Sequence, residues 1–285
     1  MKVGVISRGS PDYLIDVVAD GLIRLLGREG VSLNYNVRGG LGGRYEHLLQ
    51  RFAERDSFDI HDADALVAST RSLPEAAAWM KRTGKGKVAV VDGEDDPVIR
   101  DPWPRTAAAY FKREYLSGVP YGARILPLPF AAIPEPYDHR EERPNPLFYL
   151  AGNTHPFRRE IVGVLVEMGF RPASNLPKPE YNRILGMSMI GVSVRGLGWD
   201  TYRYWEIPYF GAAMLSQRMP IVIPGNFVDG EEAVFFDDPE DFRTKAGRML
   251  RDREGTLAIA KAGRKACLER HISVNRAKTV LEALA

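Results

Sequence analysis

The stretch Leu147-Phe148-Tyr149-Leu150-Ala151-Gly152-Asn153-Thr154-His155-Pro156 is the part of the sequence that most directly indicates the fold. It begins as a short apolar run and continues as a turn that contains glycine and proline. Such a run is typical of a buried strand that ends in a loop. Apolar residues at helical spacing follow, at Phe157, Ile161, Val164, Leu165 and Met168. A strand, a turn and a helix in this order are the unit of a parallel α/β sheet.

The same order of elements opens the chain. Residues 3–6 are an apolar run, the turn at 7–11 breaks it, and apolar residues recur at helical spacing from 14 to 26. Further strands are predicted at 31–35, 65–68 and 87–91 in the first half, and at 190–194 and 220–223 in the second. Short buried strands that alternate with amphipathic helices indicate parallel sheets covered on both faces.

A segment rich in proline and charge, residues 133–146, separates the two halves and is typical of a linker. We therefore predict an α/β protein with two Rossmann-like lobes that face each other across a cleft. The first lobe spans residues 1–140, and the second spans residues 141–285 with a run of terminal helices. Ligands of open parallel sheets bind beyond the carboxyl ends of the strands, so we expect the site residues in the loops that follow them.

Composition limits the possible partners. The 285 residues include 39 Lys and Arg against 37 Asp and Glu, a formal net charge of +2, which disfavours a surface built for nucleic acid or an anionic membrane. Cys267 is the only cysteine, so neither an intrachain disulfide nor a cysteine metal site can form. The N-terminus lacks the pattern of a signal peptide, and no apolar run is long enough to span a bilayer. We expect a cytoplasmic protein.

The turn in the opening stretch has the composition of a phosphate-binding site. Gly152 permits close approach of a ligand to the backbone beside Asn153, and Pro156 fits the first turn of a helix. His155 and Arg158 add side-chain donors to the N–H groups of the helix N-terminus. These residues are predicted to bind the phosphates of a donor. The alternative is an ordinary capped helix with a solvated basic end.

A run of carboxylates follows the predicted strand at 87–91. Close carboxylates repel one another, so one of Asp92, Glu94 and Asp95 could accept a proton as a catalytic base. An array of Asp92, Glu94 and Asp96 could instead hold Mg²⁺ or Mn²⁺. A third interpretation is a hydrated acidic turn paired with Lys112 and Arg113.

The turn after the first predicted strand contains Arg8, Gly9 and Ser10. It is a short glycine-containing loop at the carboxyl end of a strand, where ligands of such sheets bind. Because it lies in the first lobe, we predict that these three residues contact the acceptor.

Two segments of the second half carry a family resemblance: Arg203-Tyr204-Trp205-Glu206 through Gly211, and Val234-Phe235-Phe236-Asp237-Asp238. They resemble the carboxyl-terminal half of GT-B glycosyltransferases (glycosyl transferases group 1), and are most similar to the spore-maturation-protein-like (CgeB-type) branch. In that branch an Arg-x-aromatic-Glu motif precedes a small-residue helix, a short strand and an acidic turn. Terminal helices then end in a His and an Asn-Arg pair, here His271 and Asn275-Arg276.

The resemblance implies a GT-B glycosyltransferase that moves a sugar from a nucleotide-sugar donor to an acceptor. Arg203 and Glu206 lie three residues apart, on one face of a helix, and together with the resemblance this predicts that Glu206 bonds sugar or ribose hydroxyls and that Arg203 meets the phosphate. The alternative is an exposed ion pair within the helix. Arg195, in the preceding loop, would reach the same ligand. No cofactor is implied besides the nucleotide sugar as co-substrate, and a divalent metal is not expected to be required.

One position departs from the family. Many retaining members carry a second Glu eight positions after the first, where it holds the donor ribose, and this chain has Met214 there. We expect the ribose contact to pass to Glu231 or to Glu232.

The acceptor is left open between a glycan, a protein and a small molecule, with nucleic acid the least favoured. Two alternatives to a metal-independent transferase remain. One is transfer that depends on a metal held by the acidic run. The other is a two-lobed protein that binds a sugar or nucleotide without catalysis, because fold alone does not decide function.

Overall fold

The computed structural model describes residues 1–8, 12–35, 58–101, 103, 107–136, 142–150 and 155–285. The predicted site residues Gly9, Ser10, Gly152 and Asn153 lie outside these ranges. The chain forms two compact units, which we call unit 1 (Met1–Ile133 with Ile272–Ala285) and unit 2 (Pro134–His271). Both are α/β, as the alternating pattern predicted.

Unit 1 contains a parallel sheet whose described strands run in the order β2-β1-β3-β4-β5-β6. Their bounds are β1 Val3–Ser7, β2 Val31–Tyr35, β3 Ala65–Ser69, β4 Val88–Asp92, β5 Ala109–Lys112 and β6 Ile125–Pro127. Strands β1, β3 and β4 are buried along their whole length, which explains why each is an uninterrupted apolar run.

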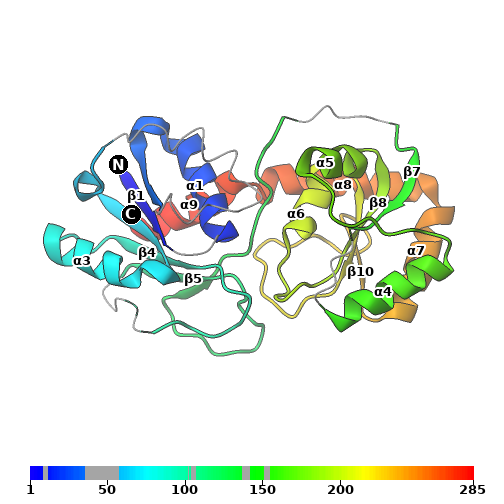
Figure 1. The fold of residues 1–285 in the computed structure, drawn as a ribbon, viewed down its shortest axis with the longest axis horizontal. Coiled ribbons are helices and arrows are strands. Elements are labelled where there is room, and N and C mark those ends of the chain that lie inside the picture. The colour runs from blue at the N-terminus through cyan, green and yellow to red at the C-terminus, as the bar shows by residue number, and fades with distance from the viewer. Residues whose placement is uncertain (9–11, 36–57, 102, 104–106, 137–141, 151–154) are drawn as a thin grey trace. The chain divides into compact units, whose positions relative to one another are not determined.

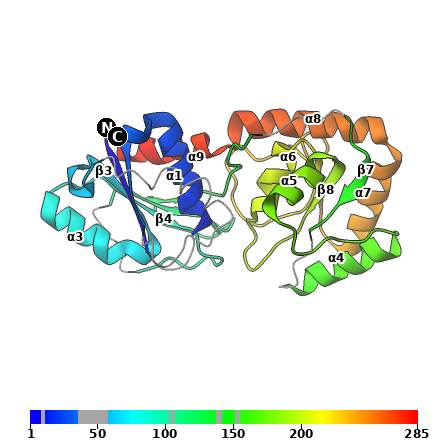
Figure 2. The same ribbon diagram turned by 45° about the horizontal axis from the view of Figure 1, so that its top comes forward.

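Helices cover both faces of this sheet. The helix α3 (Leu73–Thr83) buries Leu73, Ala76 and Trp79 against β3 and β4. The helices α1 (Tyr13–Leu26) and α9 (Ser273–Leu284) lie side by side on the other face (Figures 1 and 2). Short 3₁₀ turns at Arg28–Gly30, Ile60–Asp62 and Thr70–Ser72 complete the described part of unit 1.

The last helix belongs to unit 1, whereas the sequence assigned all terminal helices to the second lobe. The side chains of Ala277, Val280 and Leu284 on α9 are buried, and α9 packs along α1. The Ser273 hydroxyl donates to Asp20 of α1 at 2.5 Å. Gly21 allows this approach, because a Cβ at this position would lie 2.2 Å from the Ser273 carbonyl oxygen. The boundary predicted at 140/141 therefore omits a return of the chain at Ile272.

Unit 2 contains a parallel sheet in the order β10-β9-β8-β7. The strands are β7 Asn145–Phe148, β8 Ser188–Ser193, β9 Ala213–Gln217 and β10 Val234–Phe236. The helices are α4 Pro156–Glu167, α5 Lys178–Gly186, α6 Tyr202–Tyr209, α7 Pro239–Arg251 and α8 Arg253–Arg270. Its core joins apolar residues of the strands to α4, α7 and α8.

One strand of unit 2 differs from the sequence prediction. The strand expected at 220–223 is absent from the named strands of the described residues, and the small-residue segment expected to be helical forms β9 instead. The reason lies at Gly211, whose φ of 77° places it in the left-handed region that ends helices. The chain therefore leaves α6 and enters β9 within a few residues.

Across the described residues, no helix combines the length and the apolar character needed to cross a bilayer.

Candidate functional site

The carboxyl-terminal edge of the unit 2 sheet collects most of the predicted donor residues. Because β7 and β8 are parallel, the segments after both strands emerge at this edge. The first turns of α4 and α6 lie there too, since each of these helices follows a loop from a strand end. These elements contribute His155, Arg158, Arg195 and Arg203.

Arg158 ties the start of α4 to the loop after β8. Its side chain is 6% exposed, its Nε donates to the Arg195 carbonyl at 2.6 Å, and its Nη2 donates to the Val194 carbonyl at 3.2 Å. A Cβ at Gly196 would lie 3.2 Å from Nη2, so glycine there gives the guanidinium room. Arg158 is thus held by carbonyl oxygens, which leave its positive charge uncancelled.

Two further arginines point polar atoms into buried space beside it. The Nε atoms of Arg195 and Arg203 and the hydroxyl of Tyr149 are buried and have no hydrogen-bond partner. The guanidinium of Arg195 lies 3.9 Å from the Trp199 ring, which orients it. We call Tyr149, Arg158, Arg195 and Arg203 the arginine cluster. Among the residues that the structure describes, none of its three arginines has a carboxylate within ion-pair distance.

The electrostatics of this cluster reflect its unbalanced charge. Burial, and then the nearby charge of Arg203, lowers the pKa of Arg158. Burial raises the pKa of the Tyr149 hydroxyl, although the two cations Arg158 and Arg203 oppose that shift. Burial and the positive charges of Arg195 and Arg158 lower the pKa of His155. An anion bound at this edge would offset the repulsion among these positive charges.

His155 is the N-cap of α4. Its Nδ1 accepts from the backbone N–H of Phe157 at 3.2 Å, so this nitrogen carries no proton and the ring is neutral. The alternative for this turn was an ordinary capped helix with a solvated basic end. His155 does cap the helix, but Arg158 is buried rather than solvated.

Glu206 lies three residues after Arg203 on α6, is 2% exposed, and forms an ion pair with Lys178 of α5 at 2.6 Å. Lys178 also lies 3.4 Å from Glu135. The pair joins the first residue of α5 to the middle of α6. Met214 is fully buried within β9, so this position makes no ligand contact.

Glu231 lies apart from the arginine cluster. It lines a cavity of about 520 Å³ with Arg248 and Asp252, at the last turn of α7 and the start of α8. Since α7 begins at the carboxyl end of β10, its last turn lies at the opposite edge of the sheet. The structure therefore does not bring Glu231 together with the other predicted donor residues. Glu232, the other candidate for the ribose contact, forms an ion pair with Arg270.

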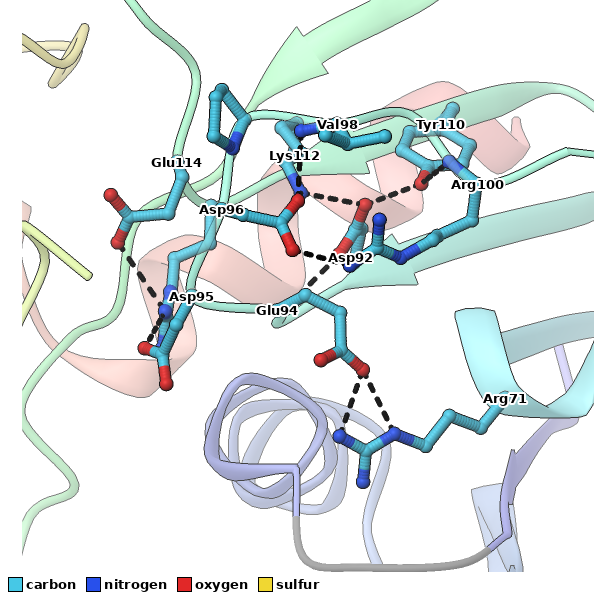
Figure 3. Close-up of polar contacts among 12 residues, drawn as sticks. Arg71, Asp92, Glu94, Asp95, Asp96, Val98, Arg100, Tyr110, Lys112 and Glu114 are labelled. Carbon is cyan, nitrogen blue, oxygen red and sulfur yellow. Dashed lines mark hydrogen bonds and ion pairs between the residues drawn. The ribbon is translucent and has the colours of Figure 1, made fainter. Parts of the chain in front are cut away.

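In unit 1 the acidic run is separated by its partners (Figure 3). Asp92 is fully buried and receives hydrogen bonds from Lys112, at 2.8 Å, and from the Tyr110 hydroxyl. Glu94 turns away toward Arg71, at 2.8 Å, and Asp95 pairs with Arg113. No three metal-ligating side chains converge anywhere in the described ranges.

These contacts give the three carboxylates different roles. Asp92 serves the fold, because its ion pair with Lys112 joins β4 to β5 inside the unit. Glu94 and Asp95 remain partly exposed. The pairing expected with Lys112 and Arg113 is found, at Asp92 and Asp95 respectively, but Asp92 is buried rather than hydrated. Glu94 and Asp95 stay candidates.

The sequence patterns did not lead us to a further buried carboxylate of unit 1, Asp12. Asp12 is 7% exposed and caps α1 by accepting from the N–H groups of Leu14 and Ile15. Burial raises its pKa to about 6, against the lowering effect of those hydrogen bonds and of Arg113. Gly93 makes room for it, since a Cβ there would lie 2.0 Å from Asp12 Oδ1. An aspartate directly before an apolar helix was the available signal.

Arg8, predicted to contact the acceptor, also lies at the carboxyl-terminal edge of the unit 1 sheet. Its Nε is 3.6 Å from an oxygen of Glu75 in the first turn of α3.

Comparison with known proteins shows which family the chain belongs to. Residues 139–282, about half of the chain, match the family model described as glycosyl transferase-like. The chain belongs to this family. No curated protein matches the sequence.

Solved structures of glycosyltransferases share the fold of this family member. HepE from Anabaena, in complex with UDP-glucose, has a TM-score of 0.69 at 8% identity, over 100% of this chain and 99% of HepE. A glycosyltransferase from Rickettsia africae has a TM-score of 0.65 at 8% identity, over 99% and 98%. Sucrose-phosphate synthase from Thermosynechococcus elongatus has a TM-score of 0.60 at 11% identity, over 99% and 98%. The fold is GT-B.

In this glycosyl transferase-like chain, the residues matched by the family model include the whole arginine cluster and Glu206. Arg8 and the acidic run of unit 1 lie outside the match. The family assignment therefore rests on unit 2 and most of α9, where the sequence resemblance was found.

Proposed function

We propose that this glycosyltransferase binds the diphosphate of a nucleotide sugar at the arginine cluster and transfers the sugar to a hydroxyl of the acceptor. The observation that carries the proposal is the set of buried donor atoms on Tyr149, Arg195 and Arg203 without partners, in a group that lacks a carboxylate counter-ion among the described residues. Buried charges are normally paired. A diphosphate would supply both the charge and the acceptor oxygens.

The cluster fits the chemistry of the leaving group. In the transfer, an acceptor oxygen bonds to the anomeric carbon, the bond from that carbon to the diphosphate breaks, and the acceptor hydroxyl loses its proton. Negative charge grows on the diphosphate as the bond breaks. Guanidinium groups held in place before the reaction stabilise that charge without reorganising. For this reason we propose a reaction that does not require a divalent metal.

The other contacts to the nucleotide sugar are proposed from where the residues lie in unit 2. Glu206, which is paired with Lys178, would accept hydrogen bonds from hydroxyls of the ribose or the sugar. Gly152 and Asn153 lie outside the described residues and stay predicted contacts of the phosphates. Glu231 is not part of this proposal.

For the proton of the acceptor we propose a carboxylate of unit 1. Glu94, Asp95 and Asp12 are the candidates, and Asp12 is the one whose pKa of about 6 suits proton transfer near neutral pH.

A thermal-shift screen with nucleoside diphosphates and nucleotide sugars tests the donor site. UDP and UDP-glucose come first, because the HepE structure contains UDP-glucose. At about 100 times its Kd, the correct nucleotide should raise Tm by roughly 5 °C. If free sugars stabilise the protein and no nucleotide does, the non-catalytic sugar-binding protein is the better explanation.

The matched variants are Arg203→Met and Arg218→Met. Both remove one guanidinium from unit 2, but Arg218 is about half exposed and pairs with Asp229 and Asp237 at the surface. We expect Arg203→Met to abolish the nucleotide-induced shift and Arg218→Met to keep it. A full shift in Arg203→Met would remove Arg203 from the donor site.

A further inference from the structure

Buried polar atoms without hydrogen-bond partners occur at the carboxyl-terminal edge of both sheets. In unit 2 they are the atoms of the arginine cluster. In unit 1 they include Arg8 Nε, Thr70 Oγ1 and Glu75 Oε2. Leaving such an atom unbonded costs free energy, so each group marks a place where a ligand would complete the bonding.

The three residues of unit 1 come together for reasons of register. Ile6 of β1 lies opposite Ala68 of β3, and Arg8 and Thr70 each come directly after the last residue of their strand. They therefore leave the sheet side by side. Glu75 joins them from the first turn of α3, where its Oε1 lies 3.6 Å from Arg8 Nε. We call Arg8, Thr70 and Glu75 the unit 1 polar group.

The bonding capacity of this group differs from that of the arginine cluster. Arg8 Nε donates, Glu75 Oε2 accepts, and the Thr70 hydroxyl can do both. The charges of Arg8 and Glu75 cancel each other. Thr70 is 8% exposed and adds no charge. The group therefore offers mixed hydrogen bonds and no net charge.

The cations around the unit 1 polar group do not change this balance. Arg71 pairs with Glu94 at 2.8 Å, Arg113 pairs with Asp95, and Lys112 pairs with Asp92 at 2.8 Å. A phosphate would need cations that are not already bound to carboxylates. A sugar hydroxyl, which both donates and accepts, matches all three unbonded atoms.

From this contrast we infer that unit 1 binds an uncharged, hydroxyl-rich acceptor, a sugar residue of a glycan or glycoside, through Arg8, Thr70 and Glu75. The inference rests on the proposed transferase function and names the acceptor class that the function leaves open. It separates the two binding sites by chemistry: unit 2 takes the charged part of the donor, and unit 1 takes a neutral sugar.

A panel of acceptors tests the class directly. The purified full chain is incubated with the nucleotide sugar selected by the thermal-shift screen and, separately, with methyl hexosides, neutral disaccharides, the corresponding sugar 6-phosphates, and a peptide rich in serine and threonine. We expect transfer to neutral glycosides and at least tenfold less to their phosphates. Transfer only to the phosphates, transfer only to the peptide, or no transfer to any glycoside would overturn the inference.

Thr70→Val isolates one contact with little change of shape. In the free enzyme the variant loses an unbonded hydroxyl, so its Tm should stay equal or rise. With the acceptor it loses a hydrogen bond, so KM for the acceptor should rise on the order of tenfold while KM for the donor stays unchanged.

Thr83→Val is the matched control, since it makes the same substitution in the same unit. The Thr83 hydroxyl is bonded to the Trp79 carbonyl at 2.8 Å. This control should lower Tm and leave KM for the acceptor unchanged. If Thr70→Val lowers Tm as much as Thr83→Val and leaves the acceptor KM unchanged, Thr70 is a structural residue and the assignment fails.

The two proposals can fail separately. Stabilisation by a nucleoside diphosphate without transfer to any neutral glycoside contradicts only the acceptor class. Absence of any nucleotide binding contradicts the transferase itself.

Discussion

At the scale of single residues, Asp12 gives the sharpest dependence on pH. Its folded-state pKa is about 6, above the ordinary value of 3.8. The folded protein therefore holds this proton more tightly than the unfolded chain. The stability that results is fully present below about pH 4 and is lost as pH rises through 6.

Asp12→Asn should remove this dependence, because asparagine remains a good N-cap and carries no charge. Relative to the wild type, the variant should gain on the order of 3 kcal/mol in unfolding free energy between pH 4 and pH 7. Urea unfolding at a series of pH values measures this difference. Parallel stability curves for the two proteins would show that Asp12 does not hold a raised pKa.

Asp92 shows why single residues were harder to predict than elements. Its position at the end of a strand was predicted, but its burial depends on Lys112 of the neighbouring strand, opposite it in register. Register between strands distant in sequence is not visible in local spacing. Arg158 and Arg203 could be proposed from the sequence because a helix start and the family motif mark them locally.

At the scale of elements, the pairing of α1 with α9 should be sensitive to one methyl group. In Gly21→Ala the new Cβ would meet the Ser273 carbonyl at 2.2 Å and Ala277 at 2.7 Å. We expect a loss of about 1–3 kcal/mol in unfolding free energy. Gly163→Ala in α4 is the control, with open space around its Cβ, and should be stabilising by up to about 1 kcal/mol. Equal effects would contradict the helix packing.

Most elements could be predicted because buried parallel strands are apolar throughout and helices repeat their apolar residues. The predicted runs at 3–6, 31–35, 65–68 and 87–91 correspond to β1, β2, β3 and β4. The strand expected at 220–223 was wrong because short apolar runs carry no periodicity that separates a strand from a loop. The helix α9 was assigned to the wrong unit because its partner α1 is distant in sequence.

At the scale of the whole molecule, the two units carry opposite kinds of unsatisfied bonding. The arginine cluster of unit 2 holds cations and donors, and the unit 1 polar group is a neutral mixture of donors and acceptors. Local patterns predicted two α/β bodies and a family, but not this division. It depends on which side chains find partners once each unit has folded.

Isothermal titration calorimetry of a nucleoside diphosphate, its monophosphate and its nucleoside tests the central claim most directly. If the arginine cluster binds the diphosphate, affinity should fall at each loss of phosphate, and Arg203→Met should weaken binding of the diphosphate by about 10- to 100-fold. The same variant should leave binding of the nucleoside unchanged. Equal affinity for nucleoside and diphosphate, or an Arg203→Met variant that binds the diphosphate as well as the wild type does, would contradict the account.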